Sequence, residues 1–484
     1  MSRDRFRLIV IGGGVSGLAA AHRALELAGE DGRRLDLTLL EAGARFGGVI
    51  ASSAREGFLL EAGPDAFIAD KPWALELCQR LGLGGELIGT NQDCRRSFIV
   101  HRGRLSPVPE GIYLGLPVRF STLFRTDLVG WRAKLRMAGE WWIPPRSGED
   151  DESVGGFVRR RFGREALERL AQPMISGIYT ADPDRLSLGA TLPQLAEMER
   201  RHGSLIRALR ARVRARDGAM RGASGPRYGL FVSLRGGMES IIGALLGRLR
   251  ERGARLRAGC RVRSVARPEP GGSWSVRAAP GETLEADAVC VALPAPQAAA
   301  VLAEALPEAA ALIGGIRYES VATVNVAFRR TDVLHALDGF GFVVPAVEGR
   351  PLIGCTFAST KFPHRAPAGS VLVRAFVGGA MHRPVASLGE EALGAMVVKE
   401  LAELIGSRSA PLWISVHRYP EAMPQYAVGH PSRMADLDRR LAGVPGLALA
   451  GNGYRGIGVP DCVRQGEQAA ERLWAAAGAV ELSR

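Results

Sequence analysis

The glycine-rich run Gly12-Gly13-Gly14-Val15-Ser16-Gly17 is the feature that most constrains how this chain can fold. It follows the apolar run 7–11, which predicts a buried parallel strand, and it precedes residues 18–28, which predict a helix. In such a unit Gly12 permits the tight turn, Gly14 lets a pyrophosphate approach the backbone, and Gly17 allows the helix to pack closely. The pattern therefore predicts an α/β, Rossmann-like fold that binds a dinucleotide at the helix N-terminus.

A second predicted strand, residues 35–40, ends in Glu41, whose carboxylate can accept hydrogen bonds from ribose hydroxyls. The chain continues Glu41-Ala42-Gly43-Ala44-Arg45-Phe46-Gly47-Gly48-Val49, and later Glu61-Ala62-Gly63-Pro64. This continuation resembles the ExxxRxGG segment of the amine-oxidase-like flavoprotein superfamily. The resemblance implies that the cofactor is FAD and that Arg45 and Gly48 lie along its pyrophosphate, with Ala42 and Val49 beside them. It also implies that the Gly63-Pro64 turn approaches the flavin.

Later segments are expected to return and complete the nucleotide domain. Residues 232–238 lead into an apolar helix, 255–265 predict a pair of strands, and 286–294 resemble the strand and turn that re-enter the FAD domain. The resemblance places Val262 against the adenine and adds Trp413 to the cofactor site.

At the C-terminus, residues 447–450 predict a strand, and a long helix is predicted from Val459 onward. The N-terminus of that helix can stabilise negative charge on reduced flavin, although an ordinary packing helix is the alternative. The predicted cofactor contacts in this region are Ala450, Gly451, Ile457, Gly458 and Val459. We expect FAD to be bound noncovalently, because Gly453-Tyr454 stands where a Cys-Tyr pair would occur.

The nucleotide motifs lie in separated pieces, so we expect the intervening segments to be insertions that build a pocket over the flavin. The FAD-binding domain is predicted from residues 1–66, 228–295 and 418–484. A mixed-sheet substrate-binding domain is predicted from 67–94 and 296–417, with strands near 320–328, 339–345, 352–357 and 371–377 and a helix near 390–405. A mainly helical insertion is predicted over 95–227.

The helical insertion contains two segments in which aromatic and aliphatic residues alternate with arginines, residues 112–120 and 131–143. They suit a membrane surface, but Trp131, Trp141 and Trp142 could equally form the core of helices under a pocket. A basic run further on is most often a solvated helix or loop, and contact with anionic lipid is the alternative. This run comprises Arg207, Arg210, Arg212, Arg214, Arg216 and Arg221.

The formal charge of +13 comes almost wholly from arginine, since the only lysines are Lys71, Lys134, Lys361 and Lys399. No zinc-finger, RNP-type or basic-helix pattern accompanies the charge, so we do not expect a nucleic-acid partner. Neither cysteines nor histidines are paired at a metal-ligand spacing, and no metal is expected. The scattered cysteines fit a reducing compartment, and no apolar run is long enough to span a membrane. We expect a cytoplasmic protein; attachment to the cytoplasmic face of the inner membrane and homodimer formation are left open.

Motifs in both insertions carry the resemblance further, to the oxygen-dependent protoporphyrinogen oxidase family. They are 61–67, 171–183, 339–345, 353–357, 362–367 and 375–379. The resemblance implies oxidation of protoporphyrinogen IX to protoporphyrin IX in heme biosynthesis, with dioxygen as the acceptor and hydrogen peroxide as the product. The substrate is a large apolar macrocycle with propionates, so it needs apolar walls and at least one cation.

Transferred position by position, the resemblance places Phe376 and Val344 against the pyrrole rings and Thr356 on the opposite wall. Gly177 brings backbone close to the macrocycle, and Asp65 faces the flavin, where proton acceptance is a hypothesis. The arginine of the family that pairs with a propionate aligns with Ser97, so Arg96 is the nearest substitute. Because neighbours on a strand point to opposite faces, Arg96 and Ser97 cannot both face the substrate, so either a local shift or Arg95 must serve.

Three alternatives stay open. Coproporphyrinogen III would suit the surplus arginines through its additional carboxylates. An amine substrate ranks lower, because the sequence places no lysine in the nucleotide frame. A protein that binds FAD without turnover would keep the glycine motif but would not need the aromatic-rich insertions.

Overall fold

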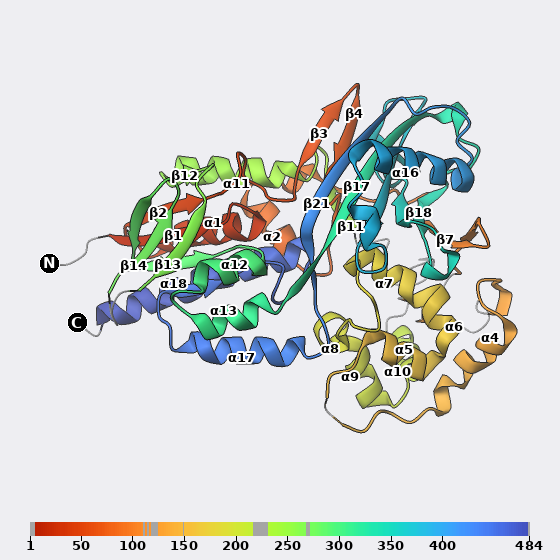
Figure 1. Cartoon of the computed structure of the whole chain (residues 1–484), viewed down its shortest axis with the longest axis horizontal. Coiled ribbons are helices and arrows are strands. Elements are labelled where there is room, and N and C mark those ends of the chain that lie inside the picture. Colours follow the sequence, from red (N-terminus) through yellow and green to blue (C-terminus); the bar gives the residue numbers. More distant parts are fainter. Residues whose placement is uncertain are drawn as a thin grey trace.

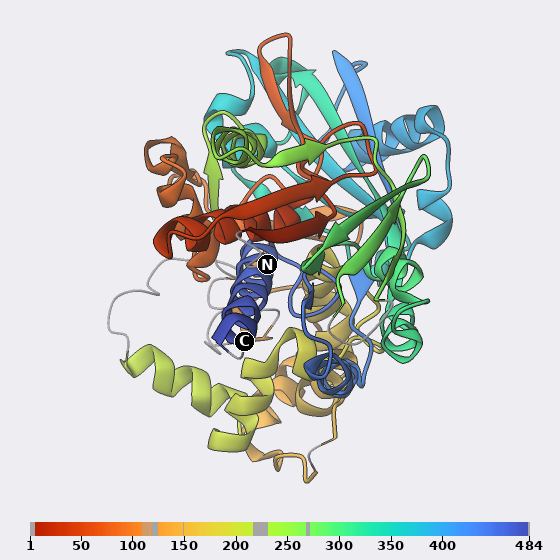
Figure 2. The same cartoon turned by 90° about the vertical axis from the view of Figure 1, so that its left-hand side faces the viewer.

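Two large sheets, several small ones and a group of helices make up the described part of the chain (Figure 1). The computed structural model describes residues 5–109, 112–113, 116–117, 124–148, 150–215, 231–267 and 272–482. Side chains are described for all of these except 112–113, 116–117, 211–215 and 478–482. The first and last elements lie at the same end of the molecule, which faces the viewer in Figure 2.

The first large sheet has five parallel strands in the order β12-β2-β1-β16-β22. The predicted βαβ unit is confirmed as β1 (Phe6–Ile11), α1 (Val15–Glu30) and β2 (Leu35–Leu40). The predicted return strands are also confirmed, because β16 (Ala288–Val291) and β22 (Leu447–Leu449) complete the sheet. The last four residues of β1 are buried, as expected for a central parallel strand.

Helices cover one face of this sheet and a small antiparallel sheet covers the other. The first layer packs α1, α11 (Glu239–Glu251) and α18 (Val459–Leu482) against Leu8 and Val10. The opposite layer packs β13 (Val262–Ala266), β14 (Trp274–Ala278) and α12 (Ala295–Leu302) against Ile9 and Ile11. Alternate residues of β1 therefore contribute to two separate cores.

The predicted strand pair at 255–265 is wrong. β12 (Arg255–Arg257) is the edge strand beside β2, whereas β13 pairs with β14 in the small sheet that β15 (Glu282–Ala286) completes. The two strands separate at Gly259, which has a φ of +69°. A bend in the left-handed region, which glycine adopts readily, sends the chain from one sheet to the other.

The second large sheet has seven strands in the order β21-β17-β20-β19-β18-β7-β8, and all neighbours are antiparallel except β18 and β7. The predicted mixed sheet is thus confirmed. Its strands are β7 (Arg96–His101), β8 (Arg104–Pro107), β17 (Arg317–Arg329), β18 (Gly339–Val343), β19 (Leu352–Thr356), β20 (Ser370–Gly378) and β21 (Trp413–Gln425). Helix α16 (Glu390–Ile405), also predicted, packs on one face.

This sheet corrects the predicted boundary at residue 95. β7 and β8 were assigned to the helical insertion, yet they pair with each other and join the large sheet through β18. The predicted boundary at 417/418 falls within β21. β7 and β8 form a local hairpin, but β18, which joins them to the large sheet, lies far along the chain, so local patterns could not assign the hairpin to this sheet.

The helical region has its own core beside the large sheet (Figure 1). Its helices are α4 (Trp131–Ala138), α5 (Val154–Phe162), α6 (Arg164–Ala166), α7 (Gln172–Tyr179), α8 (Leu188–Thr191), α9 (Pro193–His202) and α10 (Leu205–Ala215). At its centre Arg161 and Glu140 are fully buried and form an ion pair. Arg161 also donates to the carbonyls of Ile143 and Gly203, so this one side chain ties three segments together.

The remaining α-helices and β-strands of the described residues complete the fold. They are β3 (Ser52–Arg55), β4 (Phe58–Glu61), β5 (Phe67–Ile68), α2 (Trp73–Arg80), β6 (Leu87–Gly89), β9 (Ile112–Tyr113), β10 (Leu116–Pro117), β11 (Phe231–Leu234), α13 (Pro307–Gly314), α14 (Ala358–Lys361), α15 (Arg383–Ala386) and α17 (His430–Ala442).

The three tryptophans of the segment proposed to contact a membrane or to form a core differ in burial. Trp141 packs against the helical core, whereas Trp131 and Trp142 are 69% and 79% exposed. The guanidinium groups of Arg207 and Arg210 lie over the Trp141 ring. The side chains of 112–120 and of Arg212, Arg214, Arg216 and Arg221 lie outside the described residues. Within the described ranges, no helix has the length and apolar character needed to cross a bilayer.

Candidate active site

The glycine turn after β1 is packed against the neighbouring strand and open toward α1. A Cβ on Gly12 would lie 2.3 Å from the Ala292 carbonyl oxygen, and one on Gly17 would lie 1.9 Å from the Gly12 oxygen. At Gly14, by contrast, a Cβ would have no described atom within 4 Å. Gly14 is also the N-cap of α1 and provides no side-chain cap, so no capping side chain occupies the first amides of the helix. This arrangement fits a bound pyrophosphate.

Glu41 holds the neighbouring turn in place. Its carboxylate accepts hydrogen bonds from the Gly13 N–H at 2.7 Å and the Gly43 N–H at 2.6 Å. The Cys260 N–H donates to the Glu41 carbonyl, which brings the start of β13 and Val262 to the same place. These contacts fit the adenosine end of a dinucleotide, with carboxylate lone pairs left for ribose hydroxyls.

Arg45 fastens the loop that follows β2. Its guanidinium donates to the carbonyls of Gly48 at 2.6 Å and Ile50 at 3.1 Å. A Cβ on Gly48 would lie 3.3 Å from the Gly14 Cα, so this loop passes close to the helix N-terminus. Ala42, Gly48 and Val49 are exposed there, and their backbone and side chains are accessible to a ligand.

A continuous path leads from this loop to the Gly63-Pro64 turn. A Cβ on Gly63 would lie 1.9 Å from the Val49 carbonyl oxygen, so the turn abuts the loop directly. Gly14, Gly48, Val49 and Gly63 therefore follow one another away from Glu41. A dinucleotide whose ribose lies at Glu41 would extend along this path, which places its second ring system near Gly63.

The C-terminal loop adds a second boundary. Ala450 and Gly451 are buried after β22, and α18 begins at Val459, directly after Ile457 and Gly458. The Gly456 N–H donates to the Tyr426 hydroxyl at 2.9 Å, and that hydroxyl donates to the Asn452 carbonyl at 2.5 Å. Tyr426 thus fixes the loop that leads into the N-terminus of α18.

Trp413 is not brought to these loops. It lies in a separate apolar cluster with Phe58 and Leu60, where its ring meets Phe58 edge-on at 5.1 Å. We therefore leave it out of the proposed cofactor site.

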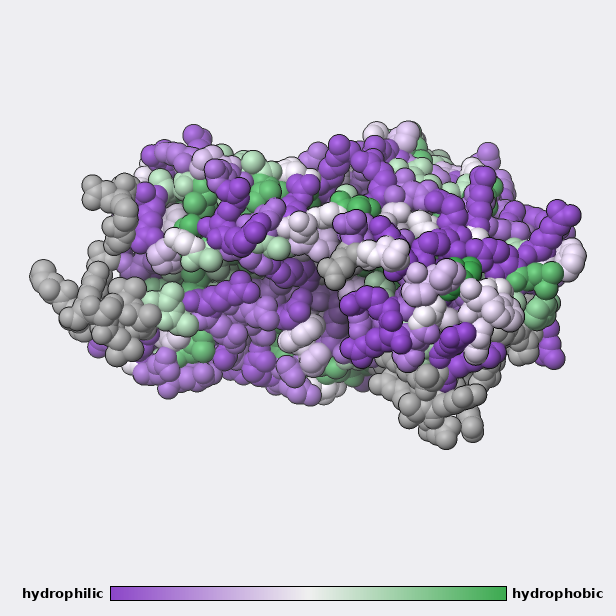
Figure 3. Space-filling view, turned by 90° about the horizontal axis from the view of Figure 1, so that it is seen from below, coloured by the Kyte–Doolittle hydropathy of each residue, from purple (hydrophilic) through white to green (hydrophobic). Residues whose placement is uncertain are grey.

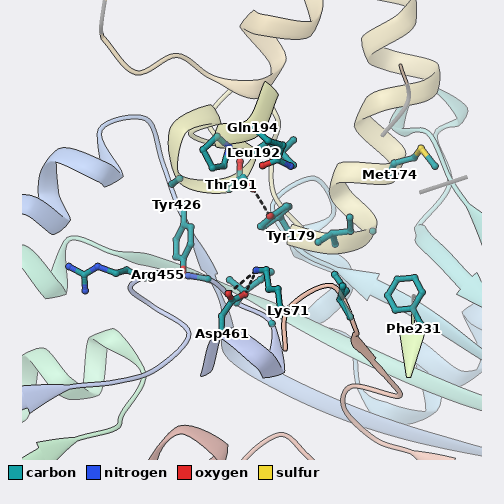
Figure 4. Close-up of a pocket in the computed structure, with 18 of the residues that line it drawn as sticks. Lys71, Met174, Tyr179, Thr191, Leu192, Gln194, Phe231, Tyr426, Arg455 and Asp461 are labelled. Atoms are coloured by element: carbon teal, nitrogen blue, oxygen red, sulfur yellow. Dashed lines mark hydrogen bonds and ion pairs between the residues drawn. The ribbon is translucent and has the colours of Figure 1, made fainter. Parts of the chain in front are cut away.

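A cavity of about 870 Å³ lies between the helical region, the large sheet and the start of α18 (Figure 4). A cavity of this volume is large enough to enclose a sizeable organic ligand. Of the predicted substrate residues, Gly177, Ser97 and Thr356 line it. Seen from below, the surface is hollowed near its middle and bordered mainly by hydrophilic residues (Figure 3).

The cavity lining combines apolar walls with charged side chains. Phe98, Phe340, Phe342 and Met174 supply apolar surface. The charged lining residues are Lys71, Lys361, Arg455, Arg464, Asp438 and Asp461. Cations therefore outnumber carboxylates in the lining, and Figure 4 shows Lys71 pointing toward Asp461.

Residues 15–474 match the family of flavin-containing amine oxidoreductases. The chain belongs to this family. With the open cradle described above, the match identifies the chain as an FAD-dependent oxidoreductase.

This flavin-containing oxidoreductase has relatives along nearly its whole length. It is 34% identical over 470 residues to a protein named coproporphyrinogen III oxidase from Bacillus subtilis (strain 168), covering 97% of this chain and 98% of that one. It is 28% identical to a chloroplastic protoporphyrinogen oxidase of Nicotiana tabacum, covering 96% and 85%. A structure named as a putative protoporphyrinogen oxidase from Exiguobacterium sp. 255-15 superposes with a TM-score of 0.84 at 32% identity, covering 100% of both chains.

Three predicted substrate residues of the flavoenzyme do not line the cavity. Val344 is buried in the core of the large sheet, and its neighbour Val343 lines the cavity instead. Phe376 is absent from the lining, and its ring lies against Arg374. Arg96 is exposed and pairs with Asp338 at 2.9 Å, because strand alternation turns Ser97 inward and Arg96 outward. We therefore no longer propose Arg96 as a carboxylate partner.

Asp65 is placed as a charge partner rather than as a base. Its carboxylate lies 3.0 Å from Lys361 Nζ and 3.4 Å from Arg374 Nη2. Burial raises the pKa of the Asp65 carboxyl, but these two cations outweigh burial and hold the pKa well below its ordinary range. A carboxylate with so low a pKa is a weak proton acceptor near neutral pH. The hypothesis of proton acceptance at Asp65 is therefore not supported by this geometry.

The sequence interpretation missed Lys71, Lys361, Arg455 and Tyr426 as lining residues. Lysine is rare in this chain, and two of its lysines line the cavity. The scarcity of lysine was the signal that could have identified them. In a chain that uses arginine almost everywhere, a lysine position indicates a specific local requirement.

Proposed function

We propose that this flavoenzyme oxidises coproporphyrinogen III to coproporphyrin III. The observation that carries the proposal is the cavity, in which aromatic walls occur together with an excess of cations. The relatives also support coproporphyrinogen III as the first candidate. Two proteins named coproporphyrinogen III oxidase, from Bacillus subtilis and Propionibacterium freudenreichii, are each 34% identical to this chain. The order favoured by the sequence interpretation, with protoporphyrinogen IX first, is thereby reversed.

The two substrates differ in charge. Both are macrocycles with apolar faces, but coproporphyrinogen carries propionates where protoporphyrinogen carries vinyl groups. Buried or half-buried carboxylates require cationic partners. Lys71, Arg455 and Arg464 have side chains 39%, 38% and 27% exposed, so each retains surface for a ligand.

The glycine turn and the loop after β2 would hold FAD, which would supply two-electron oxidation: three removals of a hydride and a proton from the macrocycle, matched by three dioxygen molecules reduced to hydrogen peroxide. The protein's part is to bind the macrocycle between the large sheet and α7, to orient its carboxylates toward Lys71 and Arg464, and to exclude water. Phe340 and Phe342 of β18 supply the apolar wall that excludes water.

Protoporphyrinogen IX is the second candidate. The 32% identity and TM-score of 0.84 to the protein from Exiguobacterium favour it. Its vinyl groups would contact the apolar walls, while its propionates would use part of the cationic lining.

We also propose that α4 contacts a membrane surface. Trp131 and Leu135 are exposed one turn apart on α4, and Trp142 is exposed just beyond it. Lys134 and Arg136 on the same helix would favour anionic lipid.

The test is an assay of the FAD-loaded protein in air with each porphyrinogen separately. Porphyrin fluorescence and hydrogen peroxide are followed together. We expect faster formation of coproporphyrin, with peroxide formed in step. A flavin spectrum without oxidation of either substrate would overturn the proposal and favour a protein that binds FAD without turnover.

A further inference from the structure

A second group of charged side chains lies behind the Gly63-Pro64 turn, and we call it the turn cluster. It consists of Glu61, Asp65, Lys361, Arg365 and Arg374. All of them are largely inaccessible, with side-chain exposures of 4%, 16%, 11%, 2% and 5%. They come from β4, the turn itself, α14, the segment after α14, and β20. The fold thus gathers them from three parts of the sequence, at 61–65, 361–365 and 374.

Positive charge exceeds negative charge within the turn cluster. Lys361 and Arg374 both contact Asp65, at 3.0 Å and 3.4 Å, and Arg365 contacts Glu61 at 3.2 Å. Three cations thus face two carboxylates, which leaves one positive charge in excess. A buried excess charge is strongly unfavourable unless a further negative charge compensates for it.

Two hydrogen-bond donors of the turn cluster have no acceptor within the described protein. Among the described residues, neither Arg365 Nη1 nor Arg374 Nε finds a hydrogen-bond partner, although both atoms are buried. Buried Nε atoms without partners occur on other arginines of the described residues too, but here two such donors lie in one cluster. The cluster is therefore incomplete as the polypeptide alone makes it.

The turn cluster adjoins the flavin end of the nucleotide path. Arg374 Nη1 donates to the Gly63 carbonyl at 2.6 Å, and Gly63 abuts Val49 on that path. On its other side the cluster reaches the substrate cavity, because Lys361 is one of the lining residues. A flavin ring at the end of the path would lie between Gly63 and the cavity, beside the excess positive charge.

We propose that the turn cluster stabilises the negative charge that the flavin gains when it accepts electrons, and so sets the reduction potential of the bound FAD. Preorganised cations in a site of low dielectric stabilise developing charge more than water does. Lys361 and Asp65 act through their charges in opposite directions. The proposal rests on FAD binding and not on the identity of the porphyrinogen.

The test measures the reduction potential of FAD in the loaded protein without any substrate, by titration against a reference dye. K361M removes the excess charge, so the reduced-to-oxidised ratio at a fixed ambient potential should fall about tenfold, which is a fall of about 30 mV for a two-electron couple. D65N removes a carboxylate and should raise the potential by a similar amount. K361R keeps the charge and should stay near the wild-type value.

K399M is the matched control, because Lys399 is exposed on α16 and its substitution removes the same charge far from the turn cluster. Shifts of K361M and D65N with the same sign, or shifts no larger than that of K399M, would overturn the proposal. If K361M fails to fold, D65N and K361R still decide it. Since no porphyrinogen is present, failure of the proposed substrate would leave this result unaffected.

Discussion

Lys71 Nζ lies 2.6 Å from the Asp461 carboxylate, which joins the loop before α2 to the first turn of α18. Asp461 is buried, whereas Lys71 keeps more than a third of its side chain exposed toward the cavity. The lysine is therefore held at the cavity by one carboxylate while it can still receive another from a ligand.

We predict that K71M raises the KM for coproporphyrinogen III roughly tenfold, because a hydrogen bond to a charged group contributes about 1.5–3 kcal/mol. The KM for protoporphyrinogen IX should rise less, since that substrate offers fewer carboxylates. Steady-state kinetics normalised to bound flavin would measure both. K399M serves as the control for charge, and an equal loss for the two substrates would contradict a role in carboxylate recognition.

The buried pair of Arg161 and Glu140 should dominate the stability of the helical region. R161M leaves Glu140 without its cation in a site of zero exposure, so we expect about 3–5 kcal/mol of destabilisation. Urea unfolding of the flavin-loaded protein would measure it. R164A removes an ion pair whose arginine is 80% exposed and should cost far less, because water screens an exposed pair. Similar effects of the two substitutions would show that burial of the pair is irrelevant.

Local signals in the sequence were enough for the elements that carry the nucleotide. The glycine turn, the two strands around it and Glu41 are neighbours in the chain, and each has a spacing fixed by the βαβ geometry. The pair at 255–265 failed because a single bend at Gly259 sends one strand into another sheet. No periodicity in an eleven-residue window records that change of partner.

The ion pairs of the site could not be predicted from the sequence, because their partners are far apart in the chain. Lys71 and Asp461 are 390 positions apart in the sequence, and Lys361 and Asp65 are 296 apart. Their meeting depends on how α18 and α14 pack, which no local pattern encodes. Ser97 and Arg96 could be predicted in part. Strand alternation indicated that only one of them faces inward, but the sequence did not indicate which one.

Acid should destabilise the protein through its buried histidines. Burial lowers the pKa of His430 below 6.5, although the hydrogen bond to the Tyr454 carbonyl partly opposes this. Below about pH 6.5 the imidazole of His430 binds a proton more readily in the unfolded chain than in the folded one. The contribution of the neutral imidazole to stability is therefore fully present above about pH 6.5 and is lost as the pH falls below it. Thermal unfolding between pH 5 and 8 should show this loss, and H430Q should reduce its slope. A stability that rises in acid would contradict the assignment.

The exposed apolar residues of α4 and of the turn that follows it should bind anionic vesicles. The double variant W131S/W142S is expected to lose most of this binding, because each indole would otherwise be buried at the lipid interface. Co-sedimentation with vesicles that contain phosphatidylserine would measure it. L412S and V428S, at exposed positions on other segments, provide the control. Equal losses for control and test variants would argue against a specific surface.

The most direct test of the account is a competition experiment with the FAD-loaded protein and equimolar coproporphyrinogen III and protoporphyrinogen IX in one reaction. The initial ratio of the two porphyrins gives the ratio of their kcat/KM values. We predict an excess of coproporphyrin that diminishes in K71M. A product that is mainly protoporphyrin, or a ratio unaffected by K71M, would contradict the claim that the cationic lining of the cavity selects the substrate.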